Sequence, residues 1–244
     1  MLRFLRHFRQ RYLAGNQFGR YLLYALGEVL LVMVGILLAL QVDNWNEQRK
    51  ERRDELELLE ALKTDLVLTR NEMDTIVEYN QKYLKGYRQI YDSIEEDRPY
   101  SPVLDSAFTD LDIWATPYLS TMTYETTQNR GIDIIQNDSL KRHIVQFYNV
   151  DFKSITEDVV KWEWSFSQNT TQPIMVEYVR RNLNTGLARP NDFEVLKRNA
   201  AFRNFLSILI TIRADNIDYS LRAKAAAERL IGHIDNELRS RQKS

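Results

Sequence analysis

Residues 21–42 read YLLYALGEVLLVMVGILLALQV and contain a single charged side chain, Glu28. At an α-helical rise of about 1.5 Å per residue, this segment spans roughly 33 Å, enough to cross a hydrocarbon core of about 30 Å. It therefore predicts one transmembrane helix. The remaining chain divides into a basic tail, residues 1–20, and a large domain, residues 43–244.

The residues around this helix indicate its processing and orientation. The apolar run is longer than the roughly 7–15 residues of a signal-peptide core, and residues 41–45 offer no small-x-small cleavage site, which favours an uncleaved signal anchor. The tail has no acidic residue, and Arg49, Lys50, Arg52 and Arg53 follow the span. The positive-inside rule then predicts, by five basic residues against four, a cytoplasmic tail lying on anionic lipid and an extracytoplasmic main domain. The tail arginines are Arg3, Arg6, Arg9, Arg11 and Arg20.

Composition excludes several classes of function. The chain has no cysteine, which rules out disulfides, thiol catalysis and zinc-thiolate sites. Five of the 33 Lys and Arg lie in the tail, and only one of the 34 Asp and Glu lies in residues 21–42, so the large domain is net negative. A negative domain argues against a nucleic-acid partner, which needs a basic face.

The large domain has a strongly helical pattern. Eight glycines and five prolines occur in 244 residues. From Leu59 onward, apolar residues recur in steps of three and four over five heptads, a pattern typical of coiled coils and helical bundles. We call these positions the heptad stripe: Leu59, Leu62, Leu66, Thr69, Met73, Ile76, Asn80, Tyr83, Tyr87, Ile90 and Ile94. Residues 44–54 contain no helix breaker, so the transmembrane helix is expected to continue into this one.

Further helices are predicted after the prolines at 99 and 102 end the long helix. Short helices are expected over 103–111 and 119–130, with Gly131 as a C-cap and Asn137 or Asp138 as an N-cap. A polar run at 167–173 is expected to interrupt or kink the next helix before a segment at 174–183. Its apolar stripe is Leu140, Ile144, Tyr148, Phe152, Ile155, Val159, Trp162 and Phe166.

The final helix is expected over about 199–241, after a loop at 184–190. Its stripe is Phe202, Phe205, Leu209, Ile212, Tyr219, Ala223, Ala226 and Leu230. Two long amphipathic helices with shorter ones between them predict an all-α fold: an antiparallel helical bundle whose two ends lie together.

The segment from Gly27 to Glu47, GEVLLVMVGILLALQVDNWNE, resembles a signature of single-pass membrane proteins from gram-negative bacteria, which form a domain-of-unknown-function family. Thr123-Tyr124-Glu125-Thr126, followed by Gly131, Asn137, Leu140 and Tyr148, resembles the family's second block. Asp43 stands where the family often has Asn. The resemblance implies anchoring in a bacterial inner membrane with a periplasmic domain, and it implies no activity.

Residue patterns for catalysis or cofactors are sparse. His7, His143 and His233 show no metal-ligand spacing, and no P-loop, GxGxxG or GxSxG motif occurs, so we expect no enzyme, metal or cofactor. Trp162, Trp164 and Phe166 are compatible with a ligand pocket, although such a group more often belongs to the core.

The membrane segment holds the candidate functional residues. Gly27, Gly35 and Ala39 lie on one helical face, and small residues let helices approach closely, so this face predicts self-association. Glu28 is either interfacial, beside Arg20 or Tyr24, or an ion-handling carboxylate within the bilayer. Asn44-Trp45-Asn46 is typical of an interfacial anchor.

Three functions remain open. The first is a membrane-anchored, non-catalytic domain that binds a partner or scaffolds a complex, its partners being the bilayer, a second copy, or an unidentified membrane or periplasmic protein. The second is an oligomeric transporter-accessory or ion-handling protein that uses Glu28. The third is a ligand sensor with a separate output partner.

Overall fold

The computed structural model describes residues 17–117 and 119–242, and the side chains of residues 21–117 and 119–241. It divides into two compact units, Met1–Asp54 and Glu55–Ser244. Helix α2 (Gln17–Glu95) runs without interruption through the boundary, so the predicted continuation of the apolar helix into the heptad stripe is confirmed. The described residues are overwhelmingly helical, which confirms the all-α class.

In the first unit, the apolar segment of α2 has no protein cover. Every large apolar side chain from Tyr21 to Val42 is more than half exposed. Among the described residues, α2 is the one helix long and apolar enough to cross a membrane, by length and composition.

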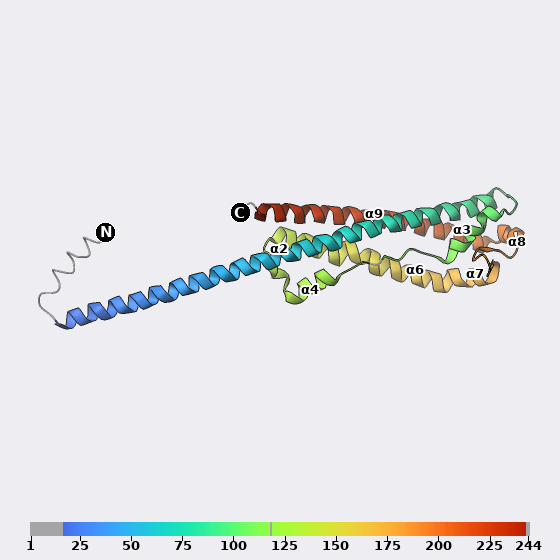
Figure 1. Cartoon of the computed structure of the whole chain (residues 1–244). Helices are drawn as coiled ribbons and strands as arrows, with labels where there is room; N and C mark the ends of the chain where they lie inside the picture. Colours follow the sequence, from blue (N-terminus) through green and yellow to red (C-terminus); the bar gives the residue numbers. More distant parts are fainter. Residues whose placement is uncertain (1–16, 118, 243–244) are drawn as a thin grey trace. The chain divides into compact units, whose positions relative to one another are not determined.

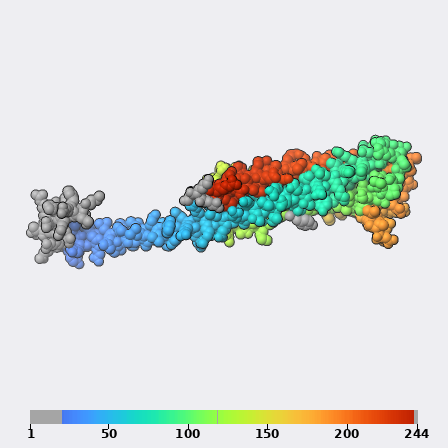
Figure 2. Space-filling view, turned by 45° about the horizontal axis from the view of Figure 1, so that its top comes forward, coloured from blue at the N-terminus to red at the C-terminus, as the bar shows by residue number. Residues whose placement is uncertain are grey.

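The second unit is a bundle of three long helical segments. They are residues 55–95 of α2, the helical run from α5 (Asp138–Gln146) to α7 (Gln172–Tyr178), and α9 (Ala200–Gln242). Figures 1 and 2 show α9 alongside this part of α2. Ion pairs that advance along α2 while receding along α9 confirm the antiparallel arrangement: Lys63–Asp235 at 2.6 Å, Asp74–Lys224 at 2.6 Å and Glu95–Arg203 at 3.7 Å.

The heptad stripe forms the buried face of α2. All eleven of its residues are buried, at no more than 7% exposed. Most of the stripe predicted for α9 is buried as well, but Tyr219 is 42% exposed and was predicted wrongly. At this level of α9 the buried positions are Asn216 and Ser220. Because both side chains are polar, the apolar pattern predicted the wrong residue.

A long connection joins α2 to α5. Helix α2 ends at Glu95, and Asp97 adopts a positive φ of 51° before Pro99. Asn137 caps α5 as predicted, its side chain accepting hydrogen bonds from the backbone N–H groups of Ser139 and Leu140. The connection contains η1 (Pro102–Leu104), α3 (Asp105–Thr109), η2 (Asp110–Asp112), α4 (Met122–Arg130) and η3 (Ile132–Ile134).

The run from α5 to α7 contains three π-helical segments. They are η4 (Phe147–Asp151), η5 (Ser154–Val159) and η6 (Ser167–Thr171), with α6 (Val160–Phe166) between the last two. The polar run at 167–173 therefore does not break the helix. A π-turn holds one residue more than an α-turn and so shifts which side chains face the core. The predicted stripe is consequently wrong at Trp162, which is 49% exposed while Glu163 is buried. Val159 and Phe166 are half-buried, and Phe166 packs against the core as predicted.

A short hairpin replaces the helix predicted up to residue 183. Strands β1 (Val179–Arg181) and β2 (Ala188–Pro190) pair antiparallel, with Arg180 opposite Arg189, and α8 (Phe193–Arg198) follows. Gly186, with a φ of 73°, lies in the connecting turn. In β1, the backbone N–H and C=O groups form hydrogen bonds with β2 instead of within a helix. The helical periodicity of a sequence does not reveal such pairing between strands.

Two glycines on the bundle helices have opposite environments, which allows a test of the packing. A Cβ added at Gly86 of α2 would lie 3.1 Å from the Ala107 Cβ of α3, whereas one at Gly232 of α9 would meet nothing within 4 Å. We expect Gly86→Val to lower the free energy of unfolding by about 1–3 kcal/mol through overpacking. We expect Gly232→Ala to raise it by about 0.5–1 kcal/mol through helix propensity. Denaturant unfolding of both variants measures this; equal effects would contradict the close approach of α3 to α2.

Candidate functional site

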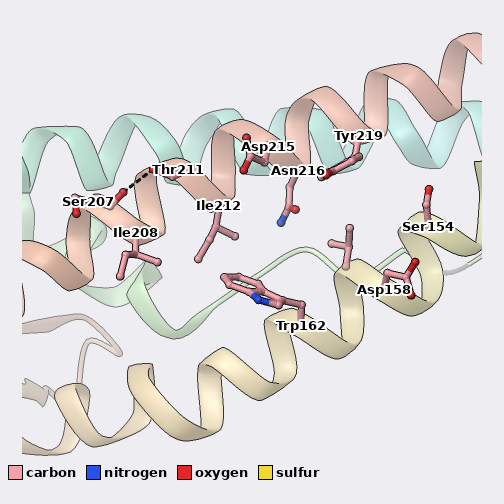
Figure 3. A pocket seen from close by; sticks show the side chains of 11 residues that line it. Ser154, Asp158, Trp162, Ser207, Ile208, Thr211, Ile212, Asp215, Asn216 and Tyr219 are labelled. Atoms are coloured by element: carbon pink, nitrogen blue, oxygen red, sulfur yellow. Dashed lines mark hydrogen bonds between the residues drawn. The ribbon is translucent and has the colours of Figure 1, made fainter.

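A groove of about 590 Å³ lies between α9 and the segment formed by η5 and α6 (Figure 3). In the close-up, the Trp162 indole lies between the two helices, and the Asn216 amide points from α9 toward α6. The lining residues are Ser154, Asp158, Val159, Trp162, Ser207, Ile208, Thr211, Ile212, Asp215, Asn216 and Tyr219.

The wall of the groove combines exposed apolar side chains with carboxylates. Trp162, Ile208 and Tyr219 are each more than 40% exposed, an unusual amount for large apolar groups on a helix surface that faces another helix. One side of the Trp162 ring stacks on Phe166, with ring centroids 5.2 Å apart. The groove therefore offers an aromatic surface whose position is fixed by a neighbouring ring.

The two carboxylates are the only formally charged groups among the residues that line the groove. Within the described part of the chain, Asp158 and Asp215 make no ion pair and no side-chain hydrogen bond. Nearby acidic residues differ: Glu157, next to Asp158, pairs with Lys161 at 3.1 Å, and Asp218, three residues after Asp215, pairs with Arg222. The carboxylates facing the groove thus keep an uncompensated negative charge.

A buried polar layer lies beneath the groove and holds its floor. We use this name for Asn80, Glu163, Arg213 and Asn216, which come from all three long segments of the bundle. Arg213 donates from Nη2 to Glu163 Oε2 at 2.9 Å and from Nη1 to the other carboxylate oxygen, as well as to Asn80 Oδ1 at 3.3 Å. Asn216 donates to Glu163 Oε1, so the amide on the floor is oriented by a buried carboxylate.

The neighbours of Arg213 favour its charged form. Burial by itself lowers the pKa of Arg213, but the nearby Tyr87 hydroxyl and Glu163 carboxylate raise it, and the net change is upward. Burial also raises the pKa of Tyr87, whose hydroxyl donates to the Asp110 carbonyl oxygen at 2.7 Å. Arg213 Nε is one of several buried polar atoms that have no hydrogen-bond partner among the described residues. The layer is therefore a network of buried, hydrogen-bonded polar side chains within the bundle.

Sequence reasoning singled out neither Glu163 nor Arg213. A partial signal was present, since Asn80 is one of the two polar positions in the heptad stripe. Trp162 was weighed as a core residue more than as a pocket residue, and it lines the groove.

The sequence-predicted residues of the membrane segment lie on α2 in the first unit. Glu28 is exposed and makes no side-chain hydrogen bond or ion pair within the described residues. A Cβ added at Gly27 or Gly35 would meet nothing within 4 Å, and Ala39 is exposed. Asn44, Trp45 and Asn46 are exposed as well. Arg3, Arg6, Arg9 and Arg11, and the side chain of Arg20, lie outside the described residues.

Two histidines far apart in the sequence come together in the bundle. His143 of α5 and His233 of α9 stack with ring centroids 4.3 Å apart and an interplanar angle of 6°. In the described part of the chain, no three histidine, aspartate or glutamate side chains are arranged to hold a metal ion. His7 lies outside the described residues.

The fold and the groove define a helical-bundle protein with a long exposed apolar helix. Residues 28–159 match the model of a family of unknown function, DUF6090, and the chain belongs to that family. The match includes Asp158 and ends before Glu163 and Arg213. Searches of curated proteins and of solved structures found no match.

Proposed function

We propose that this chain is a membrane-anchored, non-catalytic binding protein of the bacterial inner membrane. Residues 21–42 cross the bilayer once, residues 1–20 lie in the cytoplasm, and residues 43–244 bind a partner or scaffold a complex in the periplasm. The role needs an anchor and a binding surface and no reaction step.

The observation that supports this proposal is the exposure of α2. Each Leu, Ile or Val side chain that leaves water contributes about 1.5–3 kcal/mol, so the uncovered segment from Tyr21 to Val42 represents tens of kcal/mol. A bilayer is the environment that supplies this burial over the whole length of a helix. Exposed Trp45, flanked by Asn44 and Asn46, suits the lipid headgroup level at one end.

The groove favours a ligand sensor as the second candidate. Such a sensor is proposed to act through a separate output partner in the membrane. The Gly27, Gly35 and Ala39 face is the proposed contact, either with that protein or with a second copy.

Membrane integration and orientation are tested together. We expect the full chain to stay in the membrane pellet after alkaline carbonate extraction, because a spanning helix is not released by pH or salt. Fusions after Ser244 are expected to give active alkaline phosphatase and non-fluorescent green fluorescent protein, because both reporters would be exported. Release by carbonate would contradict the anchor. A fluorescent fusion would place the large domain in the cytoplasm.

A further inference from the structure

We propose that the groove between α9 and the η5–α6 segment binds a small organic cation: an ammonium group on an aromatic or alkyl body. This inference rests on the binding role proposed above and adds the chemical class of the ligand. It follows from the charge, the exposed apolar surface and the size of the groove.

The pairing of carboxylates indicates the sign of the ligand's charge. On the η5–α6 side, Glu157 is neutralised by Lys161 one turn away, while Asp158 beside it is left unpaired among the described residues. On α9, Asp218 is neutralised by Arg222, while Asp215 is left unpaired in the same part of the chain. On each side, the carboxylate that makes no ion pair within the described residues is the one that lines the groove. No Lys, Arg or His is among the lining residues, so an anion would find no cationic partner there.

The aromatic residues indicate where the ammonium group lies. The Arg222 guanidinium already lies 5.4 Å from the centroid of the Tyr219 ring. Trp162 has no such cation within the described residues, and tryptophan offers the strongest cation–π attraction of the aromatic side chains. The ammonium group is therefore placed beside the Trp162 indole, in the groove that Asp158 and Asp215 also line.

The apolar lining indicates the body of the ligand. Val159, Ile208 and Ile212 lie along the groove beside Trp162, and Ile208 is 43% exposed. A volume of about 590 Å³ falls within the range of about 300–1,000 Å³ typical of small-molecule sites. An inorganic cation would leave this apolar surface in water, whereas an organic cation covers it.

The floor of the groove is prepared for binding before a ligand arrives. The Asn216 side chain is held by its hydrogen bond to Glu163, and the Ser220 hydroxyl donates to the backbone carbonyl oxygen of Asn216 at 2.7 Å. Because Glu163 is in turn held by Arg213, the Asn216 side chain has little freedom to lose on binding. Its carbonyl Oδ1 is left to accept a hydrogen bond from an ammonium group.

The test uses two probes that share one body and differ in charge: 4-phenylbutylammonium and 4-phenylbutyrate. The full chain is held in phosphatidylcholine nanodiscs, with empty nanodiscs as the blank, and binding is measured by isothermal titration calorimetry at 0.15 M salt. We expect the cation to bind at least about tenfold more tightly than the anion, because the groove offers two carboxylates and an aromatic face. Equal binding, tighter binding of the anion, or no binding of the cation overturns the proposal.

Matched variants locate the site. The double variant Asp158→Asn/Asp215→Asn is expected to weaken cation binding about tenfold or more, and Trp162→Leu about fivefold, because each removes an attraction for the ammonium group. The double variant Glu157→Gln/Asp218→Asn removes the same number of charges from paired positions. It is expected to change binding by less than about threefold, since Glu157 and Asp218 do not line the groove and each already pairs with a basic side chain. Equal losses in the two double variants would assign binding to overall charge and overturn the site.

Failure of this inference is separable from failure of the proposed function. All substituted carboxylates are exposed, so the variants are expected to keep the melting temperature of the parent chain. If the cation fails to bind while the chain resists carbonate extraction, the ligand class is wrong and the membrane anchor stands.

Discussion

Leu66→Asp is expected to lower the free energy of unfolding of the bundle by about 4 kcal/mol or more. Leu66 is fully buried on α2, in the apolar cluster that also contains Tyr148 and Leu230. The substitution forfeits about 1.5–3 kcal/mol of apolar burial and adds an effective penalty of several kcal/mol for an unpaired buried carboxylate. For a unit of this size, each kcal/mol lowers the melting temperature by about 2–4 °C.

A control two residues away isolates burial from helix propensity and net charge. Leu68 lies on the same helix and is 59% exposed, so Leu68→Asp makes the same chemical change in water. It is expected to alter stability by no more than about 0.5 kcal/mol. Thermal melting of both variants, followed by circular dichroism of the full chain in detergent micelles, measures the difference. An unchanged melting temperature for Leu66→Asp would mean that the heptad stripe is not the core of the bundle.

The second large effect is expected at the polar layer. Arg213→Met or Glu163→Met alone is expected to lower the free energy of unfolding by about 3–5 kcal/mol, since each leaves an uncompensated buried charge. Both residues are almost completely buried, at 2% and 4% side-chain exposure. The double variant is expected to be more stable than either single variant, because two apolar side chains replace a pair whose desolvation is costly.

Guanidinium unfolding of the parent, the two single variants and the double variant gives the coupling energy between the two residues. Arg222→Met serves as the matched control, because Arg222 also pairs with a carboxylate but is 70% exposed. Its loss is expected to cost less than about 1 kcal/mol. Additive effects of the two single variants would show that Arg213 and Glu163 do not form a pair in solution.

The polar layer also suggests why the helices pack at one register. A bundle held only by apolar contacts tolerates sliding by a turn, whereas a buried Arg213 must meet Glu163 and Asn80 at one level. We therefore expect the double variant to gain in stability over the singles while its helices lose some specificity of alignment. Amide hydrogen exchange along α9 measures that loss as faster exchange around residue 213.

The elements best predicted from the sequence are those decided by neighbouring residues. The heptad stripe, the end of α2 before Pro99 and the Asn137 cap depend on residues within a few positions of one another. The bounds of α9, Ala200–Gln242, also lie within a residue of the expected 199–241. The apolar length of residues 21–42 is likewise a local property of the sequence.

The candidate site was decided by contacts between distant segments. Glu163 and Arg213 are fifty residues apart, and their pairing turns an unfavourable buried charge into a tolerated one. The π-helical segments around them rotate Trp162 out of the core, so helical periodicity assigned it to the wrong face. The hairpin at 179–190 likewise depends on a partner strand.

The sequence by itself determined a long apolar helix and a helical bundle, because hydrophobic periodicity and helix caps act over short distances. Only the tertiary structure decided which polar residues lie inside that bundle and that Asp158, Asp215 and Trp162 line one groove. The physical reason is that the burial and the pairing of a charged side chain depend on which distant segments the fold places next to it.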